Sequence, residues 1–233
     1  MLRSLRKTLL ENAYRHSKRA SRVNLYEHLA RSVRQYGLTS PARTLNVGSG
    51  GDIAATICEA GAAPISIDID PAREPDVVGS VEDLSMFDDA SFDGVFCMEV
   101  LEHVQQPFDA ARELARTLKP GGVLVGSTPF LLGIHDAPHD YFRYTKYGIS
   151  LLFKDLVETE LTPRNNLFDA AQVLPLRLYA VGTDSEKRKM AWRWPLLRMA
   201  NWAYAVVGSG ITNDDATTGY FFVFKKAEPS TSA

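Results

Sequence analysis

The sequence has little cysteine: its 233 residues include only Cys58 and Cys97, and the two do not form a CxxC motif. This count excludes a small secreted fold held together by disulfides and a structural site built on cysteine thiolates. We expect one cysteine on a helix and the other in a core strand, both as reduced, buried thiols. Such cysteine usage is typical of a cytoplasmic protein.

Long apolar runs are also lacking. The longest, such as 202–207, fall far short of the roughly 20 apolar residues that span a bilayer, so we expect no transmembrane helix. The first residues hold no apolar stretch followed by a small-residue cleavage site, and we therefore expect no secretory signal. Clusters of residues with metal-ligand spacing are absent as well, and we predict no metal site.

The net charge is only −2, but it is unevenly distributed. Residues 1–36 hold nine Lys and Arg against two Glu, which gives them +7 and leaves −9 for the remainder. We interpret 1–36 as a basic, helical amino-terminal arm, either solvated or lying over the substrate cleft. The alternative is peripheral contact with a membrane surface or with nucleic acid, and the arm lacks the Trp and Phe of an interfacial anchor.

The chain is organised around one stretch near residue 50. A short apolar strand, 43–47, leads into the glycine-rich turn 48–51, and residues 52–60 have a helical pattern. A Gly-x-Gly turn lets a ligand approach the backbone because no Cβ stands in the way, and the helix start offers unsatisfied N–H groups. A second strand, 64–68, ends about 20 residues later in Asp68, whose carboxylate can hydrogen-bond a ribose. The two features together favour a nucleoside cofactor.

The spacing of the glycines narrows the choice of nucleoside. A dinucleotide fingerprint needs a third Gly or Ala where Ile53 stands, so a nicotinamide-dependent oxidoreductase is disfavoured. No Gly-Lys-Ser/Thr follows the turn, which excludes a P-loop.

Three further stretches, 89–96, 98–104 and 118–125, carry a family resemblance. They read Asp-Ala-Ser-Phe-Asp-Gly-Val-Phe, Met-Glu-Val-Leu-Glu-His-Val and Leu-Lys-Pro-Gly-Gly-Val-Leu-Val. With the glycine-rich turn they resemble, in family order, the class I S-adenosylmethionine-dependent methyltransferases of the type 11 kind. The resemblance implies an α/β, Rossmann-like three-layer sandwich. Its seven-stranded, mostly parallel sheet would have the order 3-2-1-4-5-7-6 with one antiparallel strand, and its cofactor would be S-adenosyl-L-methionine.

Alternating strand and helix patterns agree with such a sheet. The predicted strands are 43–47, 64–68, 76–79, 93–98, 122–127, 157–162 and 219–225. The predicted helices are 21–36, 52–60, 107–118 and 146–156. We place the methyltransferase domain at 37–226, with 164–215 as an insertion before the last strand and 227–233 as a polar tail.

The resemblance also implies cofactor-binding residues at the strand ends. They are Asn46, Gly48, Ser49, Gly50, Asp68, Ile69, Ser80, Val81, Glu82, Met98, Glu99 and His103. Asn46 stands where the family usually has an acidic residue that helps to hold the cofactor's ammonium. Ser80 stands where an Asp often contacts the adenine amino group. We interpret His103 as support for the cofactor loop.

Polar residues crowd the stretch 133–145, beyond the predicted fifth strand. A zinc pair of His135 and His139 is disfavoured because a proline lies between them and further ligands are missing. A histidine, which titrates at about pH 6.5, can remove the proton of a hydroxyl acceptor. We therefore predict His139 or His135 as general base, oriented by Asp140. Acceptor-binding residues would be Tyr141, Arg143 and Tyr144. The alternative is a loop that orders itself through contacts between Asp140 and Arg143.

The sequence thus predicts a methyltransferase acting on a small-molecule or sugar acceptor, at oxygen. The alternatives are methylation of RNA or of a membrane-associated lipid or quinone, and a non-catalytic S-adenosylmethionine-binding regulator. Nucleic acid is disfavoured because the stretch after the fourth strand lacks the Asn/Asp-Pro-Pro-aromatic signature of amino methylases. The aromatic insertion, with Trp192, Trp194 and Trp202, would cover the acceptor, pack on the sheet, or pack on a second subunit in a homodimer.

Overall fold

The computed structural model describes residues 19–181, 183, 185–186, 196, 199–200, 202–204, 206–208 and 215–229. The predictions made for residues 1–18 of the arm and for Trp192 and Trp194 lie outside these residues. The chain divides into two compact units. No helix of the described residues is long and apolar enough to cross a bilayer.

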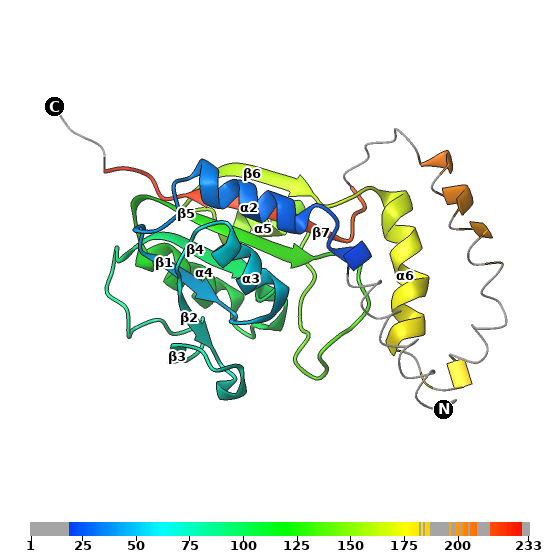
Figure 1. Cartoon of the computed structure of the whole chain (residues 1–233), viewed down its shortest axis with the longest axis horizontal. Helices are drawn as coiled ribbons and strands as arrows, with labels where there is room; N and C mark the ends of the chain where they lie inside the picture. The colour runs from blue at the N-terminus through cyan, green and yellow to red at the C-terminus, as the bar shows by residue number, and fades with distance from the viewer. Residues whose placement is uncertain are drawn as a thin grey trace. The chain divides into compact units, whose positions relative to one another are not determined.

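One unit comprises the described residues of 25–129, 136–162 and 220–233 and holds nearly all of a seven-stranded sheet (Figure 1). The strands are β1 Thr44–Val47, β2 Ile65–Asp68, β3 Val77–Val78, β4 Phe92–Met98, β5 Leu118–Pro129, β6 Val157–Pro163 and β7 Gly219–Lys225. Their order in the sheet is β3-β2-β1-β4-β5-β7-β6. The predicted fold class and strand order are confirmed.

Most of this sheet is parallel. β1 pairs in parallel with β2 and β4, and β4 pairs in parallel with β5. β7 runs antiparallel to β5, since the Gly121 N–H donates to the Lys226 carbonyl and the Lys226 N–H to the Gly122 carbonyl, both at 2.9 Å. The carboxyl ends of the parallel strands therefore meet at one edge, where open α/β sheets bind their ligands.

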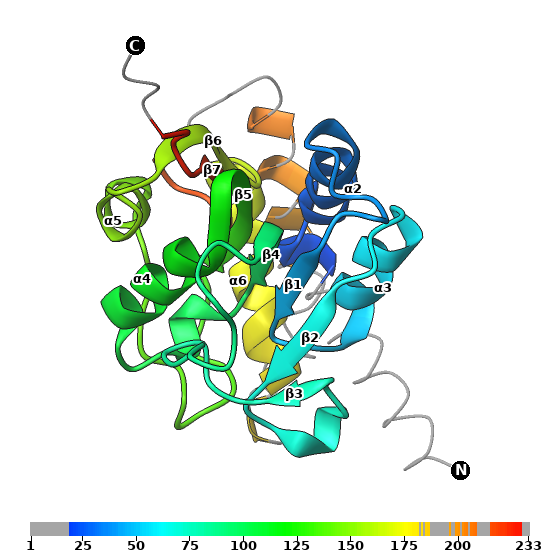
Figure 2. The same ribbon diagram turned by 90° about the vertical axis from the view of Figure 1, so that its left-hand side faces the viewer.

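Helices cover both faces of the sheet (Figure 2). α2 (Leu25–Gln35) and α3 (Gly51–Glu59) lie on one face, and α4 (Pro107–Thr117) and α5 (Lys146–Leu152) lie on the other. β1 and β4 are buried along almost their whole length, as expected for strands that are covered on both sides.

α2 begins later than predicted, at Leu25, because Asn24 takes a positive φ of 64° that a helix does not allow. Its buried residues are Leu25, Leu29, Ser32 and Val33. Val23, which lies within the predicted helix 21–36, precedes the observed helix and is 42% exposed.

The two cysteines differ. Cys97 is buried in β4 as predicted, and burial raises the pKa of its thiol, which keeps the group protonated. The prediction of a buried Cys58 is wrong: this residue is exposed. α3 turns Ile53 and Ile57 towards the core, and Cys58 lies outside that stripe.

The other unit comprises the described residues of 1–24, 130–135 and 163–219. It contains α6 (Leu167–Val181), a helix that the sequence patterns did not predict in the insertion. Hydrogen bonds join its distant segments: Thr218 Oγ1 donates to the Ser21 carbonyl at 2.9 Å, and Asn24 Nδ2 donates to the Arg164 carbonyl at 3.1 Å.

Candidate active site

The turn between β1 and α3 is shaped by glycines. Gly48, Gly50 and Gly51 have φ values of +80°, +111° and +68°, a region that other residues rarely adopt. A Cβ at Gly48 would lie 2.6 Å from Val100 Cγ2, whereas one at Gly50 or Gly51 would meet nothing within 4 Å. The turn therefore has open space at Gly50 and Gly51, whereas Gly48 packs against Val100. Because no side chain caps α3, a ligand can approach the N–H groups at the helix start.

Asp68, at the end of β2, lies beside this turn. Ser49 Oγ donates to Asp68 Oδ2 at 3.4 Å, and the Gly48 N–H donates to the Ile67 carbonyl at 2.9 Å. The Asp68 side chain is only 7% exposed, and its Oδ1 accepts from the Asp70 N–H at 2.9 Å. Since a carboxylate has about four acceptor positions, Asp68 retains acceptors for ligand hydroxyls.

Two side chains flank this carboxylate. Arg73 Nε lies 3.8 Å from Asp68 Oδ2, and Arg73 Nη1 donates to the Ser49 carbonyl at 3.5 Å. Ile69 is 75% exposed, although its side chain is large and apolar. An apolar surface beside a few fixed polar groups suits a flat heterocycle attached to a sugar.

Asn46 is a buried polar residue of β1. It is 1% exposed, and its Oδ1 accepts no hydrogen bond from the described part of the chain. A buried acceptor left without a donor costs about 1–3 kcal/mol, so such atoms call for an explanation. A donor on a ligand, such as an ammonium group, would satisfy this oxygen.

The loop after β3 contains three of the predicted residues. Val81 is 6% exposed and anchors the loop in the core. Ser80 Oγ accepts from the Glu82 N–H at 3.2 Å, and Glu82 Oε1 accepts from the Gln106 N–H at 2.7 Å, at the start of α4. Glu82 thus joins the loop to α4, and its carboxylate keeps further acceptor positions.

The ends of β4 and β5 are joined through Glu99. This residue has a φ of +57°, and strained backbone of this kind occurs often at functional sites. Its N–H donates to the Ser127 carbonyl at 2.9 Å, and Ser127 Oγ donates to Glu99 Oε1 at 3.0 Å. Met98, just before it, is 3% exposed and packs in the core.

In the predicted acceptor loop, Asp140 and Arg143 form a bidentate ion pair. The distances are 2.5 Å from Arg143 Nη1 to Asp140 Oδ1 and 2.7 Å from Nη2 to Oδ2. The Asp140 side chain is 1% exposed. The carboxylate of Asp140 raises the pKa of Arg143, because it stabilises the guanidinium charge. The contact that we considered as an ordering device for this loop is present.

His139 contacts Tyr141 in the same loop. His139 Nδ1 lies 2.9 Å from the Tyr141 hydroxyl, which also accepts from Gln105 Nε2 at 3.0 Å. The His139 carbonyl lies 2.5 Å from His103 Nδ1. The structure thus pairs the His139 ring with Tyr141, whereas both carboxylate oxygens of Asp140 bind Arg143. Sequence reasoning missed Gln105, and no motif points to it.

Two predicted site residues, Tyr144 and His135, do not lie with the others. Tyr144 is 8% exposed and donates its hydroxyl to the Leu101 carbonyl at 3.0 Å. Burial raises the pKa of this hydroxyl, and the nearby Glu102 raises it further. Tyr144 therefore packs inside the unit instead of facing an acceptor. His135 is half-buried on the segment 130–135 of the other unit.

Comparison with known proteins links this geometry to a family. Residues 45–126 match the family model described as a methyltransferase domain. The matched segment begins in β1 and ends in β5, so it contains the glycine turn, Asp68 and Glu99.

A curated relative is the ubiquinone biosynthesis O-methyltransferase of Xanthomonas oryzae pv. oryzae (strain PXO99A). It is 44% identical over 102 residues, which cover 37% of this chain and 43% of the relative. The chain thus matches less than half the length of this relative.

Solved structures share the fold at low sequence identity. The [4+2]-cyclase SpnF has a TM-score of 0.59 at 16% identity, over 87% of this chain and 81% of that protein. Phosphoethanolamine N-methyltransferase 2 of Haemonchus contortus, solved with S-adenosylhomocysteine, has a TM-score of 0.52 at 17% identity, over 87% and 53%. Because a cyclase is among these proteins, the fold alone does not define the reaction.

Proposed function

From the premise that residues 45–126 form a class I S-adenosylmethionine-dependent methyltransferase domain, we propose that the chain transfers a methyl group to an oxygen of a small-molecule acceptor. The observation that carries this proposal is the arrangement at one sheet edge. There, an open glycine turn, the Asp68 carboxylate and the orphaned Asn46 oxygen lie at the ends of β1 and β2.

These groups fit the parts of S-adenosylmethionine. Asn46 Oδ1 would accept from the ammonium of the methionine portion, and the open space at Gly50 would let that portion approach the backbone beside Gly48. The free acceptor positions of Asp68 would bind the ribose hydroxyls. The exposed Ile69 would cover one face of the adenine, with Ser80 and the Val81 N–H at its edge.

The bound cofactor supplies a methyl group already activated by its sulfonium leaving group. The chain's own residues then have two tasks, to place the acceptor oxygen in line with that methyl group and to remove the proton of the hydroxyl. We propose that His139 accepts the proton of this hydroxyl. In this proposal Tyr141 orients the imidazole, and the ion pair of Asp140 with Arg143 fixes the loop that carries it.

The acceptor in this proposal is an aromatic, quinone-like molecule, whereas the motifs alone indicated a small molecule or a sugar. The name of the Xanthomonas relative supports acceptors of the ubiquinone type, and the exposed rings of Tyr141 and Phe142 in the loop suit an aromatic acceptor. A quinone-like acceptor was one of the sequence-based alternatives. Sugars remain members of the panel to be tested.

The test is a methyl-transfer assay with S-adenosylmethionine and a panel of ubiquinone precursors, simple hydroxylated aromatics and sugars. We expect S-adenosylhomocysteine to form with the hydroxylated aromatic acceptors and not with the sugars, and the O-methylated product to appear in mass spectra. Binding of S-adenosylmethionine without turnover on any acceptor would instead support a non-catalytic regulator.

A further inference from the structure

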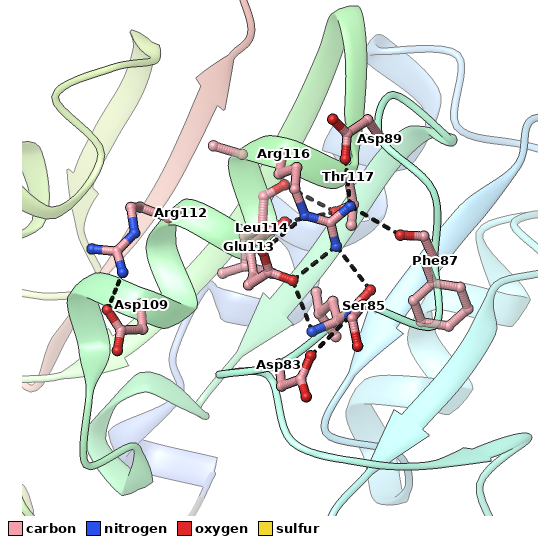
Figure 3. Close-up of polar contacts among 12 residues, drawn as sticks. Asp83, Ser85, Phe87, Asp89, Asp109, Arg112, Glu113, Leu114, Arg116 and Thr117 are labelled. Atoms are coloured by element: carbon pink, nitrogen blue, oxygen red, sulfur yellow. Dashed lines mark hydrogen bonds and ion pairs between the residues drawn. The ribbon is translucent and has the colours of Figure 1, made fainter.

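The loop that would hold the adenine has no regular secondary structure between β3 and β4, yet it is fixed at several points. At its start the Gly79 N–H donates to the Asp68 carbonyl at 2.9 Å. At its end the Ala90 N–H donates to the Arg116 carbonyl at 3.0 Å. Between these points the loop is held by side chains of α4 (Figure 3).

Arg116 uses all five of its N–H donors in these contacts. Its Nε and Nη2 donate to Glu113 Oε1 and Oε2, both at 2.8 Å. Its Nη2 also donates to the Leu84 carbonyl at 2.8 Å, and its Nη1 donates to the Phe87 carbonyl at 2.9 Å and to Asp89 Oδ1 at 2.7 Å. Glu113 completes the arrangement, because its Oε2 accepts from the Leu84 N–H at 2.8 Å.

Both backbone groups of Leu84 therefore bind one ion pair of α4, and the Leu84 side chain is fully buried. Ser80 and Val81 lie between this point and the Gly79 bond. A short irregular segment fixed at both ends has few conformations left to lose when a ligand binds. We call Glu113 and Arg116 the loop clamp.

We propose that the loop clamp is a positioning device for the cofactor, which holds Ser80 and Val81 where the adenine binds. This inference rests on the proposed function, because it takes the adenine side of S-adenosylmethionine as the ligand of this loop. Neither clamp residue touches the cofactor in the proposal. Each acts through the backbone of Leu84.

The chain provides a matched control on the same helix. Arg112 lies one turn before Arg116, but it bonds Asp109 of its own helix instead of the loop (Figure 3). Replacing Arg112 by Lys removes a guanidinium from the same surface while the Leu84 contacts stay intact. Replacing Arg116 by Lys keeps the positive charge. The ammonium group has only three donors and lacks the planar guanidinium geometry, so some of the hydrogen bonds of the loop clamp are lost.

The experiment measures binding of S-adenosylmethionine by calorimetry and steady-state kinetics for the wild type, Arg116→Lys, Glu113→Gln, the double variant and Arg112→Lys. We expect KM and Kd for S-adenosylmethionine to rise about tenfold in each single clamp variant, with kcat and the KM of the acceptor unchanged. The double variant should lose no more affinity for S-adenosylmethionine than the weaker-binding single variant, because the two residues act as a unit. Arg112→Lys should match the wild type.

Hydrogen exchange supplies a readout of the loop itself. The amides of residues 80–87 should exchange faster in the clamp variants, whereas those of 48–53 should not change. Wild-type affinity in both single clamp variants would overturn the inference and leave the proposed function standing. A wild type that binds no S-adenosylmethionine would overturn the proposed function, and the inference with it.

Discussion

The proposed cofactor edge, at the ends of β1 and β2, and the proposed acceptor loop, residues 136–145, are held together in different ways. At the ends of β1 and β2, the site consists of backbone turns and buried groups: three glycines with positive φ, a 7% exposed Asp68 and a buried Asn46. In the loop 136–145, it consists of side chains that bond close neighbours in the chain, such as Asp140 with Arg143 and His139 with Tyr141. The first region is fixed by backbone conformation and buried groups. The second is fixed by side-chain pairs within the loop and by hydrogen bonds to residues 101–105, such as that of Gln105 with Tyr141.

This difference predicts a separation of effects. Changes at the cofactor edge should alter the affinity for S-adenosylmethionine, and changes in the acceptor loop should alter turnover. A residue whose replacement lowers affinity and turnover equally would contradict this separation.

The largest effect is expected for His139→Gln. Loss of the proton acceptor should lower kcat by about 10²–10⁴-fold, while the Kd of S-adenosylmethionine stays at its wild-type value. Single-turnover methylation with a hydroxylated acceptor measures the first quantity and calorimetry the second. His28→Gln is the control, since His28 pairs with Glu160 on β6. Unchanged turnover would remove His139 as the base.

Gly48→Ala should have the next largest effect, which is a loss of stability at the cofactor edge. The new Cβ would lie 2.6 Å from Val100 Cγ2, at a residue with φ of +80°. Strain and overpacking together should lower the free energy of unfolding by about 2–5 kcal/mol. Denaturant titration measures this loss.

Gly37→Ala separates the two causes. Gly37 has a φ of +65°, but a Cβ there meets nothing within 4 Å. It should lose only the strain component, about 1–2 kcal/mol. Equal losses at both positions would show that the Val100 contact does not matter.

Asp68→Asn should weaken S-adenosylmethionine binding about tenfold, because the ribose hydroxyls lose charge-assisted hydrogen bonds. The amide keeps the size of the side chain, so kcat at saturating cofactor should not change. Asp70→Asn is the control, since it removes the same charge from a 53% exposed side chain two residues away. An unaltered Kd in Asp68→Asn would contradict the assignment of the ribose.

The smallest effect concerns acid stability. Hydrogen bonds from Arg116 lower the pKa of Glu113 in the folded state. The stabilisation from this pair is therefore complete above the unfolded pKa of about 4.3 and is lost as the pH falls through the folded value. Glu113→Gln should be less stable than the wild type at pH 7, by at most about 1 kcal/mol, and the difference should shrink below pH 4. A difference that does not depend on pH would contradict this account.

The sequence predicted the arrangement of the glycine turn and Asp68 better than that of the loop 136–145, for a physical reason. Glycine turns and strand periodicity reflect backbone conformation, which short motifs determine, so the turn at 48–51 and Asp68 were placed correctly beside one another. The burial of Tyr144 was not predicted because its hydrogen bond to the Leu101 carbonyl joins residues that are 43 positions apart. Cys58 was misjudged because the helix pattern did not decide which face of α3 is solvated.

The sequence also did not predict which side chain Asp140 binds. The motif could not reveal whether Asp140 would bind His139 or Arg143, since both lie within three residues of it. Spacing did contain one unused signal: Glu113 and Arg116 are three residues apart on a predicted helix, which indicates an ion pair. That this pair also holds the backbone of Leu84 follows only from the fold.

The central claim is that the edge formed by β1 and β2 binds S-adenosylmethionine, and titration calorimetry of the wild type and of Asp68→Asn tests it most directly. We expect saturable binding of S-adenosylmethionine and S-adenosylhomocysteine to the wild type, no binding of NAD, and about tenfold weaker binding of S-adenosylmethionine to the variant. The absence of binding to the wild type, or equal affinity of the two proteins, would contradict it.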